Sequence, residues 1–356
     1  MTEAVDSQLQ TLPFPGYITT AREWVTRTTT DIAGMVLLDS AVTTSQAERN
    51  TLYSSLAGCV GAVTSFYHYL FFSAVDAGLL TLIPRVMIRG IVANRDRVQS
   101  AVLQAYQREK ARYADRSVSS DTRKTILHPT IESSSFTHEE SLEHGMTFLG
   151  AAFKTMASAV QWAILRLGRH PEIQARLRRE ILTHLPSFPD IADDDVDCSM
   201  HTLLALPYLN AVCNEVLRIN PPQALTIREA IRDTSITGVF IPKGTFIIIL
   251  PQTVHYDQQL WGESAREFDP ERWLQPDVSR KSKLSFMPFG YGPRQCIAQL
   301  FARQELLCLV AAFVARFEAC PEDPDAPILA TDDIVPAPLD GARVRLTAVT
   351  GDIAMG

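Results

Sequence analysis

The sequence predicts a mainly α-helical protein with small β regions. Apolar residues recur at helical spacing over most of the 356 residues, and 46% of the residues are hydrophobic, so the chain can bury a large core. Runs rich in β-forming residues are confined to a short region around residues 234–250. The six cysteines contain no C-x-x-C pair, which indicates a reducing compartment. We expect residues 1–356 to form a single domain.

The net charge, the first residues and one uncharged stretch bear on which partners and which location the protein can have. The formal net charge is −7 and no dense block of lysine and arginine occurs, which argues against nucleic acid as a partner. The first six residues lack the basic start and apolar centre of a signal peptide, and we expect no N-terminal membrane anchor. The stretch Asn50 to Val75 has no Lys, Arg, Asp or Glu, but its many Ser and Thr favour buried or interfacial helices over a membrane span.

The N-terminal part is predicted to be a loose segment followed by helices. Residues 1–20 are polar and rich in proline, which is typical of an irregular entry segment. Helical patterns follow over about 20–42 and 47–91. Residues 92–113 mix basic side chains with small and apolar ones at helical spacing, which predicts an amphipathic surface helix. A polar connection is expected over 114–135.

The longest helix is expected over residues 137–168. Thr137 and Glu140 have the spacing of a capping box at its start, and Gly168 ends its apolar pattern. Gly150 lies inside the helix, where glycine costs about 1 kcal/mol relative to alanine. We therefore expect a local reason for it, such as a kink or a ligand close to the backbone.

A second apolar helix is expected over residues 203–219, after a helix over about 170–184. It carries Glu215 and Arg218, and residues at i and i+3 lie on one face of a helix. A surface pair of this kind would be worth less than about 1 kcal/mol. Because the helix is otherwise apolar, we expect the pair to be buried and to act as a unit.

The β region is expected to be a hairpin. Residues 234–240 and 245–250 are rich in β-forming residues and flank the turn signal Ile241-Pro-Lys-Gly244. Next in the chain comes His255, which, like His170, has no His, Asp or Glu at metal-ligand spacing. We interpret both histidines as ordinary polar residues.

A cysteine stands between a turn rich in Gly and Pro and a long apolar helix, within residues 286–317. It closes the pattern Phe289-x-x-Gly292-x-Arg294-x-Cys296. Just before a helix the first backbone N–H groups are unpaired and the helix dipole is positive, which favours thiolate over thiol. A lone cysteine is better interpreted as a buried structural residue. Four matched positions within one short stretch favour a cofactor site instead.

This pattern resembles the cysteine-ligand loop of the cytochrome P450 family of haem-thiolate monooxygenases, in a eukaryotic, fungal-like form. The resemblance implies haem b, with Cys296 as the iron ligand, Phe289 against the ring and Arg294 paired with a haem propionate. Gly292 would let the loop approach the flat cofactor. Backbone amides around Ala298 would donate to the sulfur. Ala298 stands where the family most often has Gly, a difference of one methyl group.

Other motifs follow in the family's order. Glu215-Val-Leu-Arg218 matches its Glu-x-x-Arg, and Phe268-Asp-Pro-Glu-Arg272 follows at the expected distance. The resemblance implies that Glu215, Arg218 and Arg272 form a network that braces the cysteine loop, and that none is a catalytic acid or base. Arg228 has the spacing of a propionate-binding arginine; the alternative is a surface arginine.

Part of the long helix, Ala151 to Ala159, resembles the family's oxygen-activation segment. The resemblance makes Thr155 the threonine that positions dioxygen and water for proton delivery. Taken alone, a threonine in an apolar helix is more often bonded back to the preceding turn. Lys154 stands where the family usually has Asp or Glu. Its charge is wrong for passing protons inwards unless burial lowers its pKa.

The resemblance implies a monooxygenase that inserts one oxygen atom from O2 into an apolar small molecule, a secondary metabolite or lipid. Electrons would come from NADPH through a cytochrome P450 reductase or a similar donor. The resemblance covers residues 137–356 best and implies a fold without its N-terminal part. The alternative is a degenerate, non-catalytic haem-binding remnant. The expected location is the cytoplasm or the cytoplasmic face of the endoplasmic reticulum, with peripheral membrane contact.

Overall fold

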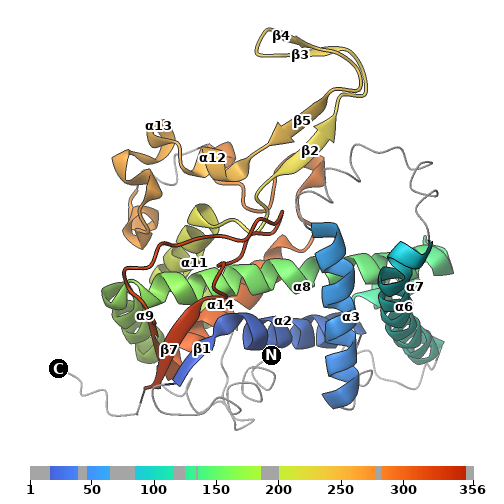
Figure 1. Ribbon diagram of the computed structural model, residues 1–356, viewed down its shortest axis with the longest axis horizontal. Coiled ribbons are helices and arrows are strands. Elements are labelled where there is room, and N and C mark those ends of the chain that lie inside the picture. Colours follow the sequence, from blue (N-terminus) through green and yellow to red (C-terminus); the bar gives the residue numbers. More distant parts are fainter. Residues whose placement is uncertain are drawn as a thin grey trace. The chain divides into compact units, whose positions relative to one another are not determined.

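The computed structural model describes residues 17–38, 46–64, 85–114, 125–133, 135–185, 200–276 and 282–349. Helices dominate these residues and the β-sheets are small, so the predicted fold class is confirmed (Figure 1). The contacts divide the chain into two compact units. The first holds Met1–Pro13 and Arg22–Ala157, and the second holds Phe14–Ala21 and Ser158–Gly356.

The first unit is built from helices around one apolar core. These are α2 (Ala21–Leu38), α3 (Gln46–Thr64), α6 (Arg85–Ala114), α7 (Leu127–Glu132) and the first part of α8 (His138–Gly168). Helix α6 begins earlier than the amphipathic pattern predicted. Where α8 passes α6, a Cβ on Gly145 would lie 2.7 Å from Cγ1 of Val102, so this close approach requires glycine. The core includes Leu37, Leu56, Val102, Leu149 and Phe153.

Helix α7 was not predicted, because its residues were assigned to the polar connection. Pro129 is its third residue, where the backbone N–H would have no helical partner in any case, so proline is tolerated. His128 of α7 lies 2.7 Å from the Glu109 carboxylate of α6, measured from Nδ1 to Oε1. The prediction of a continuous connection was therefore wrong for these residues; residues 115–124 lie outside the described part.

Helix α8 begins and ends as predicted. Thr137 N donates to Glu140 Oε2 at 2.8 Å, and Glu140 N donates to Thr137 Oγ1 at 3.2 Å, which is the predicted capping box. A Cβ on Gly150 would meet only Cγ2 of Val60, at an ordinary 3.8 Å. Among the described residues, backbone crowding is therefore not the reason for this glycine.

Helix α8 is also long and apolar enough to cross a membrane, by length and composition. However, 67% of its most apolar window is buried inside the protein. Core helices of soluble proteins pass the same test. The burial favours a core helix. Of the apolar stretch Asn50 to Val75, the part from residue 65 onward lies outside the described residues.

The second unit contains the remaining large helices, which are α9 (Pro171–His184), α10 (Met200–Ala205), α11 (Pro207–Ile219) and α14 (Gln299–Arg316). The single helix predicted over 203–219 was wrong, because Pro207 starts a new helix at its first position. Helix α14 is buried from Glu305 to Ala315 except at Cys308, which is half-buried. At its start, by contrast, Ile297 is 84% exposed just before the helix and Leu300 is 70% exposed within it.

A three-stranded antiparallel sheet joins the two ends of the described chain. Its order is β1 (Tyr17–Thr20), β7 (Arg343–Ala348) and β6 (Phe317–Pro321), with Tyr17 opposite Leu346. The sequence did not predict this sheet, and residues 17–20 were assigned to the loose entry segment. The strands are short and far apart in the chain, so local patterns carried little signal.

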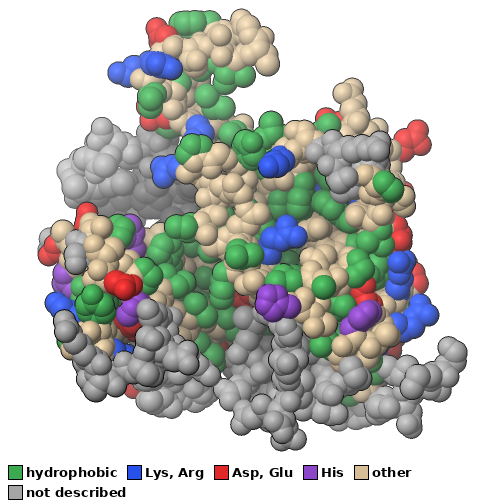
Figure 2. Space-filling view, turned by 180° about the vertical axis from the view of Figure 1, so that it is seen from behind, with side chains coloured by type: hydrophobic (Ala, Val, Ile, Leu, Met, Phe, Trp, Pro, Cys, Tyr) green, Lys and Arg blue, Asp and Glu red, His purple; other side chains and the backbone are tan. Residues whose placement is uncertain are grey.

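Two further antiparallel pairs replace the predicted hairpin. β2 (Thr226–Glu229) pairs with β5 (Phe246–Ile249), and β3 (Thr234–Ile236) pairs with β4 (Val239–Ile241). The turn between β3 and β4 is Thr237-Gly238, with φ of 49° and 84°, as two-residue hairpin turns require. The predicted turn at residues 241–244 instead leads from β4 into β5. Hydrophobic side chains are exposed along this projecting β region (Figure 2).

Candidate functional site

Glu215 is the centre of a buried ionic network. It lies on α11 and is fully buried, as is Arg218 one turn later. Oε1 and Oε2 of Glu215 accept from Nη2 and Nε of Arg218, both at 2.8 Å, in a two-pronged pair. Oε1 also accepts from Nε of Arg272 at 2.9 Å. The structure thus brings together the three residues that the two sequence motifs predicted.

Backbone and aromatic groups complete this network. Arg218 Nη1 donates to the carbonyl oxygens of His255 and Ala265, each at 2.6 Å. Trp273 Nε1 donates to Glu215 Oε2 at 2.8 Å. Burying a charge costs several kcal/mol unless the charge is paired and hydrogen-bonded. These ion pairs and hydrogen bonds therefore make it possible to bury the charged side chains of the network. The network ties α11 to the segment that contains Arg272.

The cysteine loop has one anchored half and one exposed half. Ser285 and Pro288 are buried, whereas every residue from Tyr291 to Ala298 is exposed. Gly290 and Gly292 have φ of 73° and 79°, a conformation that only glycine adopts readily. Across this turn, Cys296 N donates to Phe289 O at 2.9 Å. The loop is therefore closed on itself just before the cysteine side chain.

The donor set of this loop fits a haem-thiolate ligand site. Cys296 is exposed and lies three residues before the first residue of α14, Gln299. Among the described residues, the N–H groups of Ile297 and Ala298 have no hydrogen-bond acceptor, so both are available to a sulfur ligand. An exposed apolar side chain, Ile297, directly follows the cysteine. A thiol with free amides and apolar surface beside it matches the needs of a flat, apolar cofactor.

The remaining residues predicted for the cofactor lie as follows. Arg294 is exposed and has no ion-pair partner within the part of the chain that the structure describes. Phe289 is half-buried beside a cavity of the loop. Arg228 is exposed on β2, where Nη1 donates to Thr226 Oγ1 at 2.7 Å and to Ile227 O at 2.9 Å. Arg294 is therefore the freer of the two arginines.

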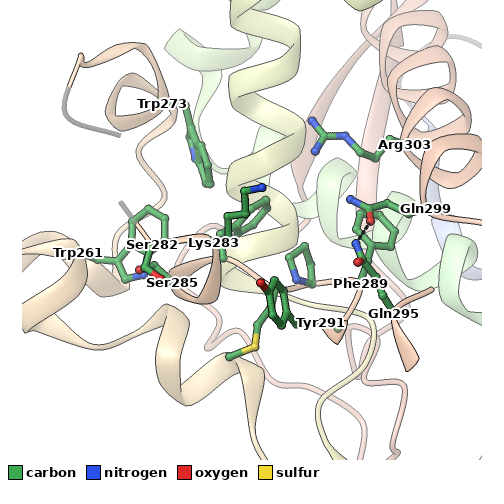
Figure 3. Close-up of a pocket in the computed structure, with 14 residues that line it drawn as sticks. Trp261, Trp273, Ser282, Lys283, Ser285, Phe289, Tyr291, Gln295, Gln299 and Arg303 are labelled. Atoms are coloured by element: carbon green, nitrogen blue, oxygen red, sulfur yellow. Dashed lines mark hydrogen bonds between the residues drawn. The ribbon is translucent and has the colours of Figure 1, made fainter. Parts of the chain in front are cut away.

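A cavity of about 420 Å³ lies against the anchored half of the loop. Figure 3 shows Trp273 and Lys283 on one side and Gln299 and Arg303 on the other, with Gln295 bonded to Gln299. Arg303 Nη2 donates to Asn214 Oδ1 at 3.1 Å. Lys283 has no ion-pair partner among the described residues. The cavity therefore combines aromatic walls with two cationic side chains.

Thr155 and Lys154 lie on the part of α8 that belongs to the first unit. Both side chains are half-buried. Thr155 Oγ1 donates to the carbonyl oxygen of Ala151 at 2.7 Å, which is the bond back to the preceding turn that a threonine in a helix commonly forms. The hydroxyl thus has a partner within its own helix.

A backbone hydrogen bond joins two distant segments of the second unit. The N–H of Ala224, which follows α11, donates to Ile334 O at 3.2 Å. These are the segments 222–227 and 334–335, which are far apart in sequence. Their adjacency is what a shared cavity wall requires.

Sequence reasoning missed one residue of this site, His255. It was interpreted as an ordinary polar residue, but it is fully buried between Arg218 and the start of the cysteine loop. Its partners are backbone groups, which leave no mark on the spacing of side chains. The other histidine considered, His170, bonds through Nδ1 to Arg166 O at 2.7 Å.

Two buried acids stand out in the helices beneath the loop. Burial raises the pKa of Glu305, on α14, to about 8, and its Oε1 has no hydrogen-bond partner among the described residues. Burial also raises the pKa of the Cys213 thiol on α11, which keeps it protonated and inert. Cys213 is therefore no competitor to Cys296 as a thiolate.

Comparison with known proteins places these features in a family context. The family model described as Cytochrome P450 matches residues 11–340, which span both compact units. Cytochrome P450 monooxygenase sphH of Aspergillus fumigatus is 34% identical over 359 residues, covering 99% of this chain and 65% of that protein. Cytochrome P450 monooxygenase ptmK of Penicillium ochrochloron is 36% identical over 231 residues, covering 63% of this chain and 44% of that protein. The chain thus spans 65% or less of the length of these relatives.

Proposed function

The chain belongs to the cytochrome P450 family, and from that membership we propose that it binds haem b through Cys296 and acts as a monooxygenase. The observation that carries this proposal is the exposed cysteine at the end of a glycine turn, with backbone N–H groups beside it that have no acceptor among the described residues and with a buried ionic network behind it. A haem held there by Cys296 would supply dioxygen chemistry, which a thiolate ligand would promote.

The residues of the loop would divide the work of binding. Cys296 provides the thiolate, and the amides of Ile297 and Ala298 are placed to donate to its sulfur and tune its charge. Arg294, which has no ion-pair partner in the described ranges, offers its guanidinium to a carboxylate such as a propionate. Arg228 is a second candidate for that role. The network of Glu215, Arg218 and Arg272 keeps the anchored half of the loop in place, and takes no part in proton transfer.

We propose that Thr155 forms hydrogen bonds with dioxygen and water. Its hydroxyl would have to exchange the bond to Ala151 O for one to the ligand. Lys154, directly before it, is the feature that sets this chain apart, because an ammonium repels the protons that must arrive.

The substrate that we propose is an apolar small molecule, a secondary metabolite or a lipid. The fungal relatives are named as cytochrome P450 monooxygenases, which supports the type of reaction. The joined segments at Ala224 and Ile334 would form part of the wall that holds the substrate and excludes water.

For electrons we propose NADPH through a cytochrome P450 reductase or a similar donor. Lys283 and Arg303 line the cavity beside the cysteine loop and give it positive charge, which suits an acidic partner. The reduction rate should then fall as the ionic strength rises, because salt screens surface charges. We propose the cytoplasm or the cytoplasmic face of the endoplasmic reticulum as the location, with peripheral membrane contact, which cell fractionation would test.

A second candidate is a haem-binding protein without efficient turnover. One feature favours it: Lys154 stands where the family usually has Asp or Glu. In this case the same loop would bind haem, but reduced enzyme would release peroxide instead of oxidised substrate.

A reduced carbon-monoxide difference spectrum of the purified full chain tests the proposal. We expect a thiolate-type Soret band after reconstitution with haem. A chain that shows no such band would refute Cys296 as an iron ligand. With NADPH, a reductase and apolar test substrates, oxygenated product would support the monooxygenase, whereas peroxide alone would support the second candidate.

A further inference from the structure

His255 is the last residue of the short helix α12 (Pro251–His255), and its side chain is fully buried. A fully buried histidine must satisfy both ring nitrogens or lose about 1–3 kcal/mol for each one left unpaired. In His255 both ring nitrogens have hydrogen-bond partners. One partner is the backbone of Arg218 on α11, and the other is the backbone of Met287 in the cysteine loop.

The two bonds fix the tautomer of the ring. Met287 N lies 3.0 Å from Nε2 of His255, and a backbone amide can only donate, so Nε2 carries the lone pair. The proton must therefore be on Nδ1, which donates to the carbonyl oxygen of Arg218 at 3.0 Å. Burial lowers the pKa of His255 to about 4, so this neutral form persists at neutral pH.

Arg218 returns the contact. Its Nη1 donates to the carbonyl oxygen of His255 at 2.6 Å, so each of the two residues binds the backbone of the other through its side chain. The ring of His255 therefore has a fixed position relative to the network of Glu215, Arg218 and Arg272.

From Met287 the connection runs on to the cysteine through the loop itself. Met287 O accepts from Gly290 N at 3.1 Å, and Phe289 O accepts from Cys296 N at 2.9 Å. Phe286, next to Met287, packs 5.5 Å from the ring of His255, measured between ring centroids. Within the described part of the chain, the hydrogen bond that Met287 N donates to His255 Nε2 thus joins the anchored half of the loop to the helices beneath it.

We propose that His255 is a positioning residue for the cysteine ligand: its neutral ring pins Met287 to the backbone of Arg218 and thereby sets where Cys296 is held. This inference rests on the proposed role of Cys296 for its functional consequence, but the pinning itself is a property of the chain without cofactor. His255 touches none of the reacting groups and acts only through the loop.

Three substitutions separate the two bonds. His255→Phe keeps a ring of similar size and removes both. His255→Gln keeps an acceptor at the position of Nε2 for Met287, and His255→Asn keeps a donor at the position of Nδ1 for Arg218. His184→Gln serves as the matched control, because His184 is exposed on α9 and far from the loop in sequence.

The first measurement is amide hydrogen exchange in the full chain without haem. Exchange at Met287 should be about tenfold faster in His255→Phe and His255→Asn, which corresponds to roughly one lost hydrogen bond, and nearly unchanged in His255→Gln and His184→Gln. Equal protection of Met287 in wild type and His255→Phe would overturn the pinning, whether or not the chain binds haem.

The second measurement is the carbon-monoxide difference spectrum after haem loading. In His255→Phe and His255→Asn the thiolate-type band should convert several-fold faster to the band of haem that has lost its thiolate, and His255→Gln should restore the wild-type rate. A wild type without the thiolate band would refute the proposed function alone. A wild type with the band, and a His255→Phe variant that keeps it equally long, would refute the positioning role alone.

Discussion

Arg218 and His255 hold each other through reciprocal side-chain to main-chain hydrogen bonds, of 2.6 Å from Arg218 Nη1 and 3.0 Å from His255 Nδ1. The same guanidinium also forms the two-pronged pair with Glu215. One fully buried charge therefore connects the ionic network to the residue that meets the cysteine loop. Substitutions in the ionic network or at His255 should therefore alter the conformation of the cysteine loop.

Removing the acid of the network should be strongly destabilising. In Glu215→Gln, Arg218 and Arg272 keep their charges inside the protein without a counter-charge, which costs on the order of 3–5 kcal/mol. Denaturant unfolding of the full chain without haem measures this loss. Glu23→Gln breaks an exposed Glu–Arg pair and should cost no more than about 0.5 kcal/mol. Similar losses in the two variants would contradict the network's role.

Removing the thiol should abolish the ligand but leave the fold intact. Cys296 is exposed, so Cys296→Ser should change the unfolding free energy by less than about 0.5 kcal/mol. The thiolate-type Soret band should disappear completely. Cys320→Ser, at another exposed cysteine, should keep the band. A band that survives Cys296→Ser would show that another residue binds the iron.

Glu305 should make the protein less stable as the pH rises. Its folded-state pKa of about 8 lies above the ordinary value of 4.5, so its contribution is complete below pH 4.5 and is lost as the pH rises through 8. Glu305→Gln should abolish this loss, which amounts to roughly 3–5 kcal/mol between pH 5 and pH 9. Unfolding curves across that range measure it. Glu318→Gln, at an exposed glutamate, should keep the wild-type dependence of the unfolding free energy on pH. If Glu305→Gln shows that same wild-type dependence, the prediction is refuted.

His255 should act in the opposite direction, on the acid side. Because burial lowers its folded-state pKa to about 4 from 6.5, its contribution is complete above pH 6.5 and is lost as the pH falls through 4. The loss is roughly 3 kcal/mol in total. In His255→Gln the unfolding free energy should therefore fall less steeply between pH 7 and pH 4.5. An unchanged slope would mean that another group titrates there.

Lys154 should limit the yield of oxygenated product. If its charge hinders proton arrival at Thr155, Lys154→Asp should raise the ratio of product to peroxide per NADPH oxidised by about tenfold or more. The measurement is the coupling ratio of the haem-loaded chain with a reductase. Lys110→Asp, at an exposed lysine of α6, is the control and should leave that ratio unchanged. If the ratio does not rise in Lys154→Asp, the charge of Lys154 does not limit the yield of oxygenated product.

Local patterns predicted the helices best. The capping box at Thr137 and Glu140 marked the start of α8, because both partners lie within one turn of the chain. The break at Pro207 was missed, although proline at the first position of a helix is itself a local signal. Strand pairing was harder to predict, because the sequences of Thr237-Gly238 and of residues 241–244 are both compatible with a turn. Only the pairing of β2 with β5 decides between them.

The sequence by itself determined the family to which the chain belongs. The spacing of Phe289, Gly292, Arg294 and Cys296 and the two motifs that contain Glu215, Arg218 and Arg272 indicated the family, which the match over residues 11–340 confirmed. Tertiary structure alone decided how Glu215 shares its two oxygens among Arg218, Arg272, Trp273 and the backbone of Asp269, and that His255 joins Arg218 to Met287. The physical reason is that side-chain spacing reports which faces of an element are buried. Bonds to backbone carbonyl and amide groups, which every residue possesses, leave no such pattern.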